Sequence, residues 1–179
     1  VLNESKEVKN VEFETVINAS NEIITIDGYV FNSVNPQELT ITTGSNVINI
    51  YYTKRTDLSY TVNYLEKDTN KVLNQSKEVK NVEFETVINA SNEIIEIDGY
   101  VFNSVNPQEL TITTGSNVIN IYYTKRTDLS YTVNYLEKDT NKVLNQSKEV
   151  KNVEFETVIN ASNEIIEIDG YVFNSVNPQ

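Results

Sequence analysis

The 179-residue sequence contains no cysteine, histidine, methionine or tryptophan. Without cysteine the chain can form no disulfide bond and no thiolate metal site, and without histidine the usual ligands of zinc and haem are missing. Ser-His and Cys-His catalytic arrangements are excluded for the same reason. We therefore expect no enzymatic activity, no catalytic residue, no cofactor and no bound metal.

Long hydrophobic runs and an excess of positive charge are also absent. No apolar stretch approaches the roughly 18 residues that a membrane-spanning helix needs, so direct membrane insertion is not expected. The chain has 14 Lys and Arg against 26 Asp and Glu, which gives a net charge of −12. Nucleic acid is therefore not an expected partner, because contacts to phosphates require Lys and Arg.

An internal repeat dominates what is present. The segment that begins at Val1 returns at Val72 and again at Val143, with a period of 71 residues. Two of its positions vary, because Glu4 becomes glutamine and Thr25 becomes glutamate in the later copies. The period exceeds the roughly 20–50 residues of solenoid repeats and suits a small domain with its own core. The chain begins and ends in mid-repeat, which indicates a fragment of a longer protein.

A short charged link, Lys125 to Ser130, separates successive copies and is typical of a domain junction. The predicted domains are a first copy over 1–56 that lacks its first strand, a complete middle copy over 57–127, and a third copy over 128–179 that lacks its last hairpin. A domain this small is not expected to fold alone after losing a central strand.

Strand signals recur in every copy. Residues 60–67 alternate between apolar and polar side chains, which is the pattern of a half-buried strand. The Asp-Thr-Asn-Lys sequence that follows predicts a turn into a second strand. Alternation also predicts a strand over 82–88 and another over 99–105. The clearest hairpin is expected over 109–126, where a Gly-Ser-Asn turn joins two β-rich segments.

The segment 89–97 is ambiguous. Asn89 or Ser91 could cap a short helix there, although an extended conformation also fits this stretch. Apolar residues of the strands supply the core, and each is expected to contribute about 1.5–3 kcal/mol when buried. The predicted core residues of the middle copy are Val62, Tyr64, Phe84, Ile94, Tyr100, Ile112, Ile119 and Ile121.

The order of these landmarks resembles the MucBP (mucin-binding protein) repeats of Gram-positive bacterial surface proteins, over the whole chain. The residues that carry the resemblance are Val62, Tyr64, Asp68 to Asn70, Gly99, Tyr100 and Ile119 to Tyr123. It implies a mainly β (α+β) fold class, a tandem array of small β-grasp (ubiquitin-like) repeat domains. In such a domain the first and last strands pair in parallel at the centre of the sheet.

Aromatic residues are the candidate ligand contacts. The candidates are Tyr122, Tyr135 and Phe102, and an exposed tyrosine such as Tyr122 could form a stacking platform for a sugar with Tyr135 or Phe102. The alternative is ring pairing between neighbouring strands, which is the more common use of such residues.

Clustered carboxylates are a second feature with two readings. Glu83 and Glu85 share one face of the expected strand, with Glu93, Glu96 and Asp98 nearby. A calcium site or an acid-base pair would use such a group. A solvated surface is the favoured interpretation, because charged side chains are mostly exposed.

The resemblance implies a location outside the cell, on the bacterial surface, with cell-wall anchoring through a region beyond this fragment. The leading hypothesis is a structural stalk or adhesion repeat that extends a binding head from the wall. The alternative is that each repeat binds mucin glycans or host surface proteins weakly and gains avidity from multiplicity. Neighbouring identical repeats are further expected partners, with strands exchanged between chains.

Overall fold

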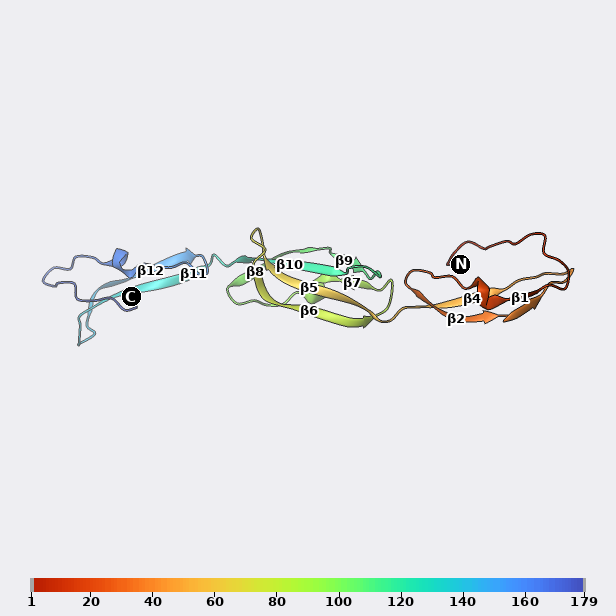
Figure 1. The fold of residues 1–179 in the computed structure, drawn as a ribbon. Coiled ribbons are helices and arrows are strands. Elements are labelled where there is room, and N and C mark those ends of the chain that lie inside the picture. The colour runs from red at the N-terminus through yellow and green to blue at the C-terminus, as the bar shows by residue number, and fades with distance from the viewer. Residues whose placement is uncertain (1, 179) are drawn as a thin grey trace. The chain divides into compact units, whose positions relative to one another are not determined.

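A computed structural model of the protein describes residues 2–178. The chain is mainly β, and the structured segments follow one another along the chain as drawn in Figure 1. They are β1 (Val16–Asn18), η1 (Ala19–Glu22), β2 (Tyr29–Asn35), β3 (Glu38–Thr40), β4 (Asn49–Lys54), β5 (Leu58–Glu66), β6 (Val72–Val82), β7 (Val87–Asn89), η2 (Ala90–Glu93), β8 (Tyr100–Asn106), β9 (Glu109–Thr111), β10 (Val118–Lys125), β11 (Leu129–Leu136), β12 (Val143–Val153) and η3 (Ala161–Glu164).

Contacts group the chain into two units, each of them discontinuous in sequence. The first unit contains residues 1–64, 75–93 and 105–121, and the second contains residues 65–74, 94–104 and 122–179. The domain boundaries expected near Asp57 and Asp128 stay predictions. The names first, middle and third copy are therefore used below for the sequence ranges alone.

The largest sheet lies in the middle copy, with its strands in the order β6-β5-β10-β8 (Figure 1). The first and last strands of this copy, β5 and β10, are neighbours at the centre of the sheet. The N–H of Thr61 donates to the carbonyl oxygen of Asn117 at 2.9 Å, and the N–H of Lys67 donates to that of Tyr123 at 2.8 Å. From the first bond to the second, the residue number rises by six on both strands, so β5 and β10 run parallel.

The predicted fold class of tandem β-grasp domains is wrong. The strands of the described chain form five separate sheets, four of which have two strands. Its helical residues are confined to the 3-10 turns η1, η2 and η3, of four residues each, none of which can cover a sheet. All of these helices are also too short to span a membrane. Of the alternatives left open for 89–97, the structure has a short helix at η2, and the side chain of Asn89 before it accepts the N–H of Ser91 at 3.0 Å.

The hydrophobic core is concentrated in the middle copy. Its buried apolar residues are Leu58, Tyr60, Val62, Tyr64, Ala90, Ile112, Ile119, Ile121 and Tyr123. Elsewhere in residues 2–178, Ala19 is the only buried hydrophobic residue. Of the predicted core residues, Phe84, Ile94 and Tyr100 are only half-buried, and the other five are buried.

Identical sequences adopt different structures in the three copies. Val72–Val82 forms β6 and Val143–Val153 forms β12, whereas the equivalent residues 2–11 form no strand. The first copy lacks the preceding strand that β5 and β11 supply to the other two. Similarly, residues 171–177 have the sequence of β8 but form no strand, because the third copy lacks a counterpart of β10. A pairing partner therefore decides whether these segments form strands.

The strand predicted over 82–88 is interrupted. Phe84 and Glu85 form a turn in which the N–H of Thr86 donates to the carbonyl oxygen of Glu83 at 3.2 Å. Glu85 has a φ of 65°, in the left-handed region that non-glycine residues seldom adopt. The turn removes Phe84 from the core of its own copy.

The hairpin predicted over 109–126 does not form either. β9 pairs antiparallel with β7, and β10 lies between β5 and β8. The buried side chain of Asn117 fixes this path, because it accepts the N–H of Thr113 at 2.9 Å and donates to the carbonyl oxygen of Ser59 at 3.0 Å. The Asn117 amide thus directs the chain toward β5 instead of back along β9.

Candidate functional site

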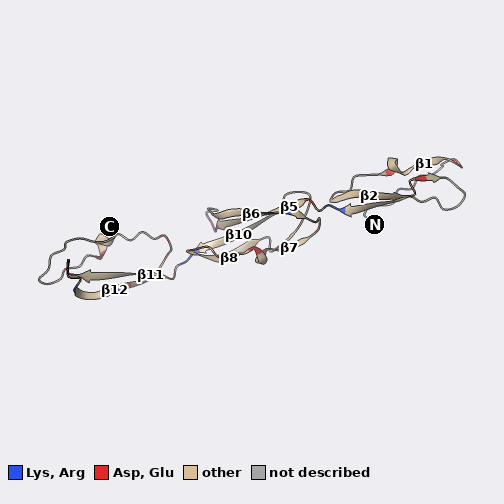
Figure 2. Cartoon of the chain, turned by 90° about the horizontal axis from the view of Figure 1, so that it is seen from below, with Lys and Arg blue, Asp and Glu red and all other residues tan. Residues whose placement is uncertain are grey.

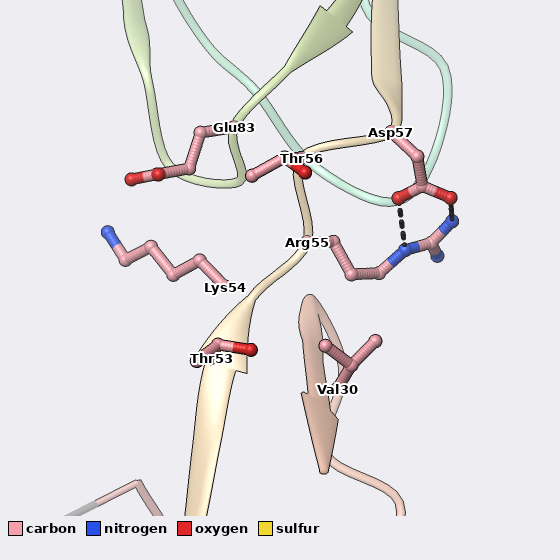
Figure 3. Close-up of a pocket in the computed structure, with 7 residues that line it drawn as sticks. All are labelled: Val30, Thr53, Lys54, Arg55, Thr56, Asp57 and Glu83. Carbon is pink, nitrogen blue, oxygen red and sulfur yellow. Dashed lines mark hydrogen bonds and ion pairs between the residues drawn. The ribbon is translucent and has the colours of Figure 1, made fainter. Parts of the chain in front are cut away.

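An open hollow lies at the link between the first and middle copies, inside the first unit. It is lined by Val30, Thr53, Lys54, Arg55, Thr56, Asp57 and Glu83. Figure 3 shows Arg55 and Asp57 on one side of the chain and Lys54 and Glu83 on the other. The second unit contains an equivalent hollow, whose lining includes Val101, Thr124, Lys125, Arg126, Thr127, Asp128 and Glu154. The hollow therefore recurs with the repeat.

A bidentate ion pair organises each link. The Nε and a terminal nitrogen of Arg55 each lie 2.9 Å from an oxygen of Asp57 (Figure 3). These two hydrogen bonds lower the pKa of Asp57 below its usual value and raise that of Arg55. Arg126 and Asp128 repeat the arrangement at 2.9 and 2.8 Å. These exposed groups are already paired, so they position the link and offer no free acid or base.

A buried carboxylate lies at the end of η2. Glu93 is 8% exposed and accepts hydrogen bonds from the hydroxyl of Tyr60 at 2.9 Å and from Nζ of Lys77 at 2.5 Å. Burial alone would raise the pKa of Glu93, but the hydrogen bonds from Lys77 and Tyr60 hold it below its usual value. The expectation of a solvated surface is thus wrong for Glu93, because η2 turns this side chain toward β5 and β6.

This cluster links three segments of the middle copy and has the properties of a structural contact. Tyr60 belongs to β5 and Lys77 to β6, so the Glu93 carboxylate ties both strands to η2. Both carboxylate oxygens have a partner, as a buried charge requires. Among residues 2–178, no group of three or more acidic residues is arranged to hold a metal ion.

Tyr60 is expected to lower the free energy of unfolding as the pH rises above about 10. Burial, followed by the hydrogen bond to Glu93, raises the pKa of Tyr60 from 10.0 to about 12. Between these values the unfolded chain releases the phenol proton and the folded chain retains it, so stability falls as the pH rises. Urea denaturation at pH 10 and pH 12 should show Tyr60→Phe losing less stability than wild type, by on the order of 2 kcal/mol. An equal loss of stability between pH 10 and pH 12 in Tyr60→Phe and in the wild-type chain would refute this role.

The three candidate aromatic residues lie on different strands. Tyr122 is half-buried on β10, Tyr135 is half-buried on β11, and Phe102 is 46% exposed on β8. Phe102 meets Tyr123 edge to face, with ring centroids 6.4 Å apart. The Tyr135 hydroxyl donates to the carbonyl oxygen of Glu164 at 3.3 Å. The structure thus engages Phe102 and Tyr135 in separate contacts, and a ligand-binding role for these residues stays a prediction.

The outer edge of β8 is a candidate surface for binding an extended chain. The sheet order leaves β6 and β8 at its two edges. β6 carries Lys77, Glu78 and Lys80, whereas β8 has no charged residue and is tan along its length in Figure 2. Charged residues on an edge strand discourage further pairing, and an uncharged open edge permits it. On β8, Val101 and Phe102 are also exposed, at 47% and 46%.

Sequence reasoning missed this surface because strand order decides it. A strand was predicted over 99–105, close to the observed β8, but its place at the edge depends on pairing between distant segments. The only local signal is the contrast between the uncharged run Tyr100–Asn106 and the charged Val72–Val82 segment.

Comparison with known proteins identifies a family that the sequence reasoning did not consider. The family model of the CS domain matches residues 3–54 and 61–125, which together make up more than half of the chain. Among curated proteins, none matches the chain. CS domains are β-sandwich domains of co-chaperones, and they mediate protein–protein interaction.

This match overturns several expectations. The resemblance to MucBP repeats is wrong, and so is the β-grasp fold that it implied. The hypotheses of an adhesin stalk and of a mucin-binding module are wrong for the same reason. The match supports protein partners in general, but it does not support mucin glycans, neighbouring identical repeats or strand exchange between them. Location outside the cell stays a prediction.

The matched segments span nearly all of the first and middle copies and include the strands from β1 to β10, except for the first three residues of β5. The chain belongs to the CS domain family.

Proposed function

We propose that the chain is a non-catalytic protein-interaction module, associated with chaperones, that binds an extended segment of a partner protein along the open edge of β8. The observation that carries this proposal is the contrast between the two edges of the four-stranded sheet. β6 is interrupted by charges, and β8 is uncharged and exposes Val101 and Phe102. Membership of the CS domain family supports a protein as the partner.

The β8 strand is already ordered by the sheet before a partner binds. On its inner side β8 pairs with β10, whose Ile119 and Ile121 are fully buried, so the edge is fixed before binding. Its unpaired backbone groups would supply hydrogen bonds to an added strand. Covering a side chain such as Val101 would contribute up to about 1.5–3 kcal/mol. The net charge of −12 favours partner segments that carry Lys or Arg near the bound stretch.

A matched pair of variants tests this function. Asn103 lies in the middle of β8 and Asn74 lies on β6, and both are exposed. Asn103→Lys places a charge on the open edge and is expected to weaken binding of the full chain to a purified chaperone by about tenfold. Asn74→Lys changes net charge equally on the other edge and is expected to leave the affinity unchanged.

Calorimetric titration of both variants against a panel of purified ATP-dependent chaperones gives the answer. A weaker affinity confined to Asn103→Lys supports binding along β8. Equal affinities for the two variants, or the absence of binding to every chaperone by the wild-type chain, would contradict the proposal.

A further inference from the structure

Three phenylalanines occupy the same position of the repeat but have different surroundings. Phe84 and Phe155 are half-buried, whereas Phe13 is 59% exposed. Their neighbouring sequences are the same, Val-Glu-Phe-Glu-Thr in each copy. The difference therefore comes from the partners of each ring, because Phe84 contacts Tyr29 of the first copy and Phe155 contacts Tyr100 of the middle copy.

Phe84 of the middle copy covers a glycine of the first copy, and both residues belong to the first unit. A Cβ atom at Gly28 would lie 2.3–2.4 Å from Cε1, Cδ1 and Cζ of Phe84. Near-equal distances to three consecutive ring atoms place this position over the face of the ring. Gly28 is buried and has a φ of +78°. The next residue, Tyr29, meets the same ring edge-on, with centroids 5.6 Å apart at 71°.

The second unit repeats this packing between the middle and third copies. A Cβ atom at Gly99 would lie 2.4 Å from each of three atoms of the Phe155 ring, and Gly99 has a φ of +76°. Tyr100 meets Phe155 edge-on, with centroids 5.7 Å apart at 68°. The two contacts agree closely, although they involve different pairs of copies.

Backbone hydrogen bonds reinforce each contact. The N–H of Phe84 donates to the carbonyl oxygen of Arg55 at 2.8 Å, and the N–H of Arg55 donates to that of Gly28 at 2.9 Å. Arg55 thereby links the glycine of one copy to the phenylalanine of the next. Arg126 forms the same two bonds at 2.8 and 2.9 Å, to Phe155 and Gly99 respectively.

An ion pair also recurs beside each ring. Nζ of Lys54 lies 2.9 Å from a carboxylate oxygen of Glu85, and Nζ of Lys125 lies 3.0 Å from one of Glu156. The hydrogen bond to the glutamate raises the pKa of each lysine. Exposed pairs of this kind contribute little energy but favour one orientation of the turn.

The glycine of the third copy provides an unoccupied counterpart. Gly170 has a φ of +77°, is exposed, and would have no atom within 4 Å of an added Cβ. Residues 94–108 and 165–179 are identical in sequence, so Gly99 and Gly170 differ in their surroundings alone. Local sequence therefore sets the glycine conformation, and the ring of a following copy covers it.

The geometry points to a specific interface between successive copies. In it, the Phe-Glu turn of one copy (Phe84–Glu85 or Phe155–Glu156) packs on the Gly-Tyr turn of the copy before it (Gly28–Tyr29 or Gly99–Tyr100). The partner of this surface is a second copy of the same repeat. The face of the phenylalanine ring packs against the glycine backbone, which has no side chain to hold the ring away. The edge of the neighbouring tyrosine ring and a Lys–Glu ion pair lie beside this contact. The interface requires glycine both for its positive φ and for the close approach of the ring.

Proton NMR of the full chain tests the interface with an internal control. A ring face above Gly99 should move its Hα resonance upfield of that of Gly170, since the two glycines have the same sequence neighbours. Phe155→Leu should remove the difference while the Gly28 resonance stays shifted by Phe84. Coincident Gly99 and Gly170 resonances in the wild type, or a difference that persists in Phe155→Leu, would overturn the proposal.

Amide hydrogen exchange provides an independent second measurement. Gly99→Ala and Gly170→Ala introduce the same strain at a positive φ, but only the first adds a Cβ against a ring. The Phe155 N–H, which donates to Arg126, should exchange about tenfold faster in Gly99→Ala than in Gly170→Ala. Equal exchange rates in the two variants would show that the ring does not depend on the glycine and would overturn the interface.

Discussion

Replacing Ile121 by asparagine is expected to abolish cooperative unfolding of the middle copy. Ile121 is fully buried on β10, between β5 and β8. The substitution removes apolar contacts and introduces a carboxamide without hydrogen-bond partners, which together cost about 4 kcal/mol or more. That is most of the stability of a domain at the lower end of the usual range of about 5–15 kcal/mol, where small domains are expected. Urea denaturation of the full chain, followed by circular dichroism, measures the loss.

The first copy contains a matched control for this prediction. Ile50 occupies the equivalent position in the same Asn-Val-Ile-Asn-Ile-Tyr-Tyr sequence but is only half-buried, because no counterpart of β5 covers it. Ile50→Asn is expected to cost less than about 1 kcal/mol. Similar losses in both variants would contradict the conclusion that the core is concentrated in the middle copy.

Replacing Glu93 by alanine is the second change with a large expected effect. It leaves the buried hydroxyl of Tyr60, a residue 6% exposed, without its acceptor and removes the ionic partner of Lys77. An unsatisfied buried hydroxyl and a broken charge-assisted bond together should lower the free energy of unfolding by about 2–3 kcal/mol. The same urea denaturation at neutral pH measures the change.

Glu22→Ala is the matched control for Glu93→Ala. Glu22 occupies the equivalent position of the first copy and pairs with Lys6 at 2.6 Å, but the two side chains are 28% and 69% exposed. The loss is expected to stay within about 0.5 kcal/mol. A loss as large as that of Glu93→Ala would show that burial does not set the strength of the cluster.

Local patterns in the sequence predicted local structure well. The alternation over 60–67 and the turn after it became β5 and β6, and Asp68 and Asn70 of the turn adopt the expected left-handed conformation, with φ values of 69° and 56°. The buried isoleucines of β10 were also predicted from alternation. These features depend on side chains within one or two strands, so a pattern of neighbouring residues is sufficient to find them.

Structure that depends on distant segments was predicted less well. β9 pairs with β7 instead of β10, because the Asn117 amide bonds to Ser59 on another strand. The family was assigned from short motifs, such as Gly-Tyr, that are not specific to one fold. Identical copies also gave no information about which residues act between copies, so the contact of Phe84 with Gly28 had no sequence signal.

The candidate binding surface shows the same limit. Tyr122, Tyr135 and Phe102 were selected because aromatic residues on strands often contact ligands, but their partners depend on the sheet order. The charge contrast between β6 and β8 is visible in the sequence. It acquires meaning only when both strands are found at the edges of one sheet.

Residue-resolved hydrogen exchange of the full chain, alone and with a saturating purified chaperone, tests the proposed function most directly. The proposal predicts that amides of β8, Tyr100–Asn106, gain protection in the complex while those of β6, Val72–Val82, do not. Protection that appears on β6, or that leaves β8 unchanged although the chaperone is bound, would contradict binding along the uncharged edge.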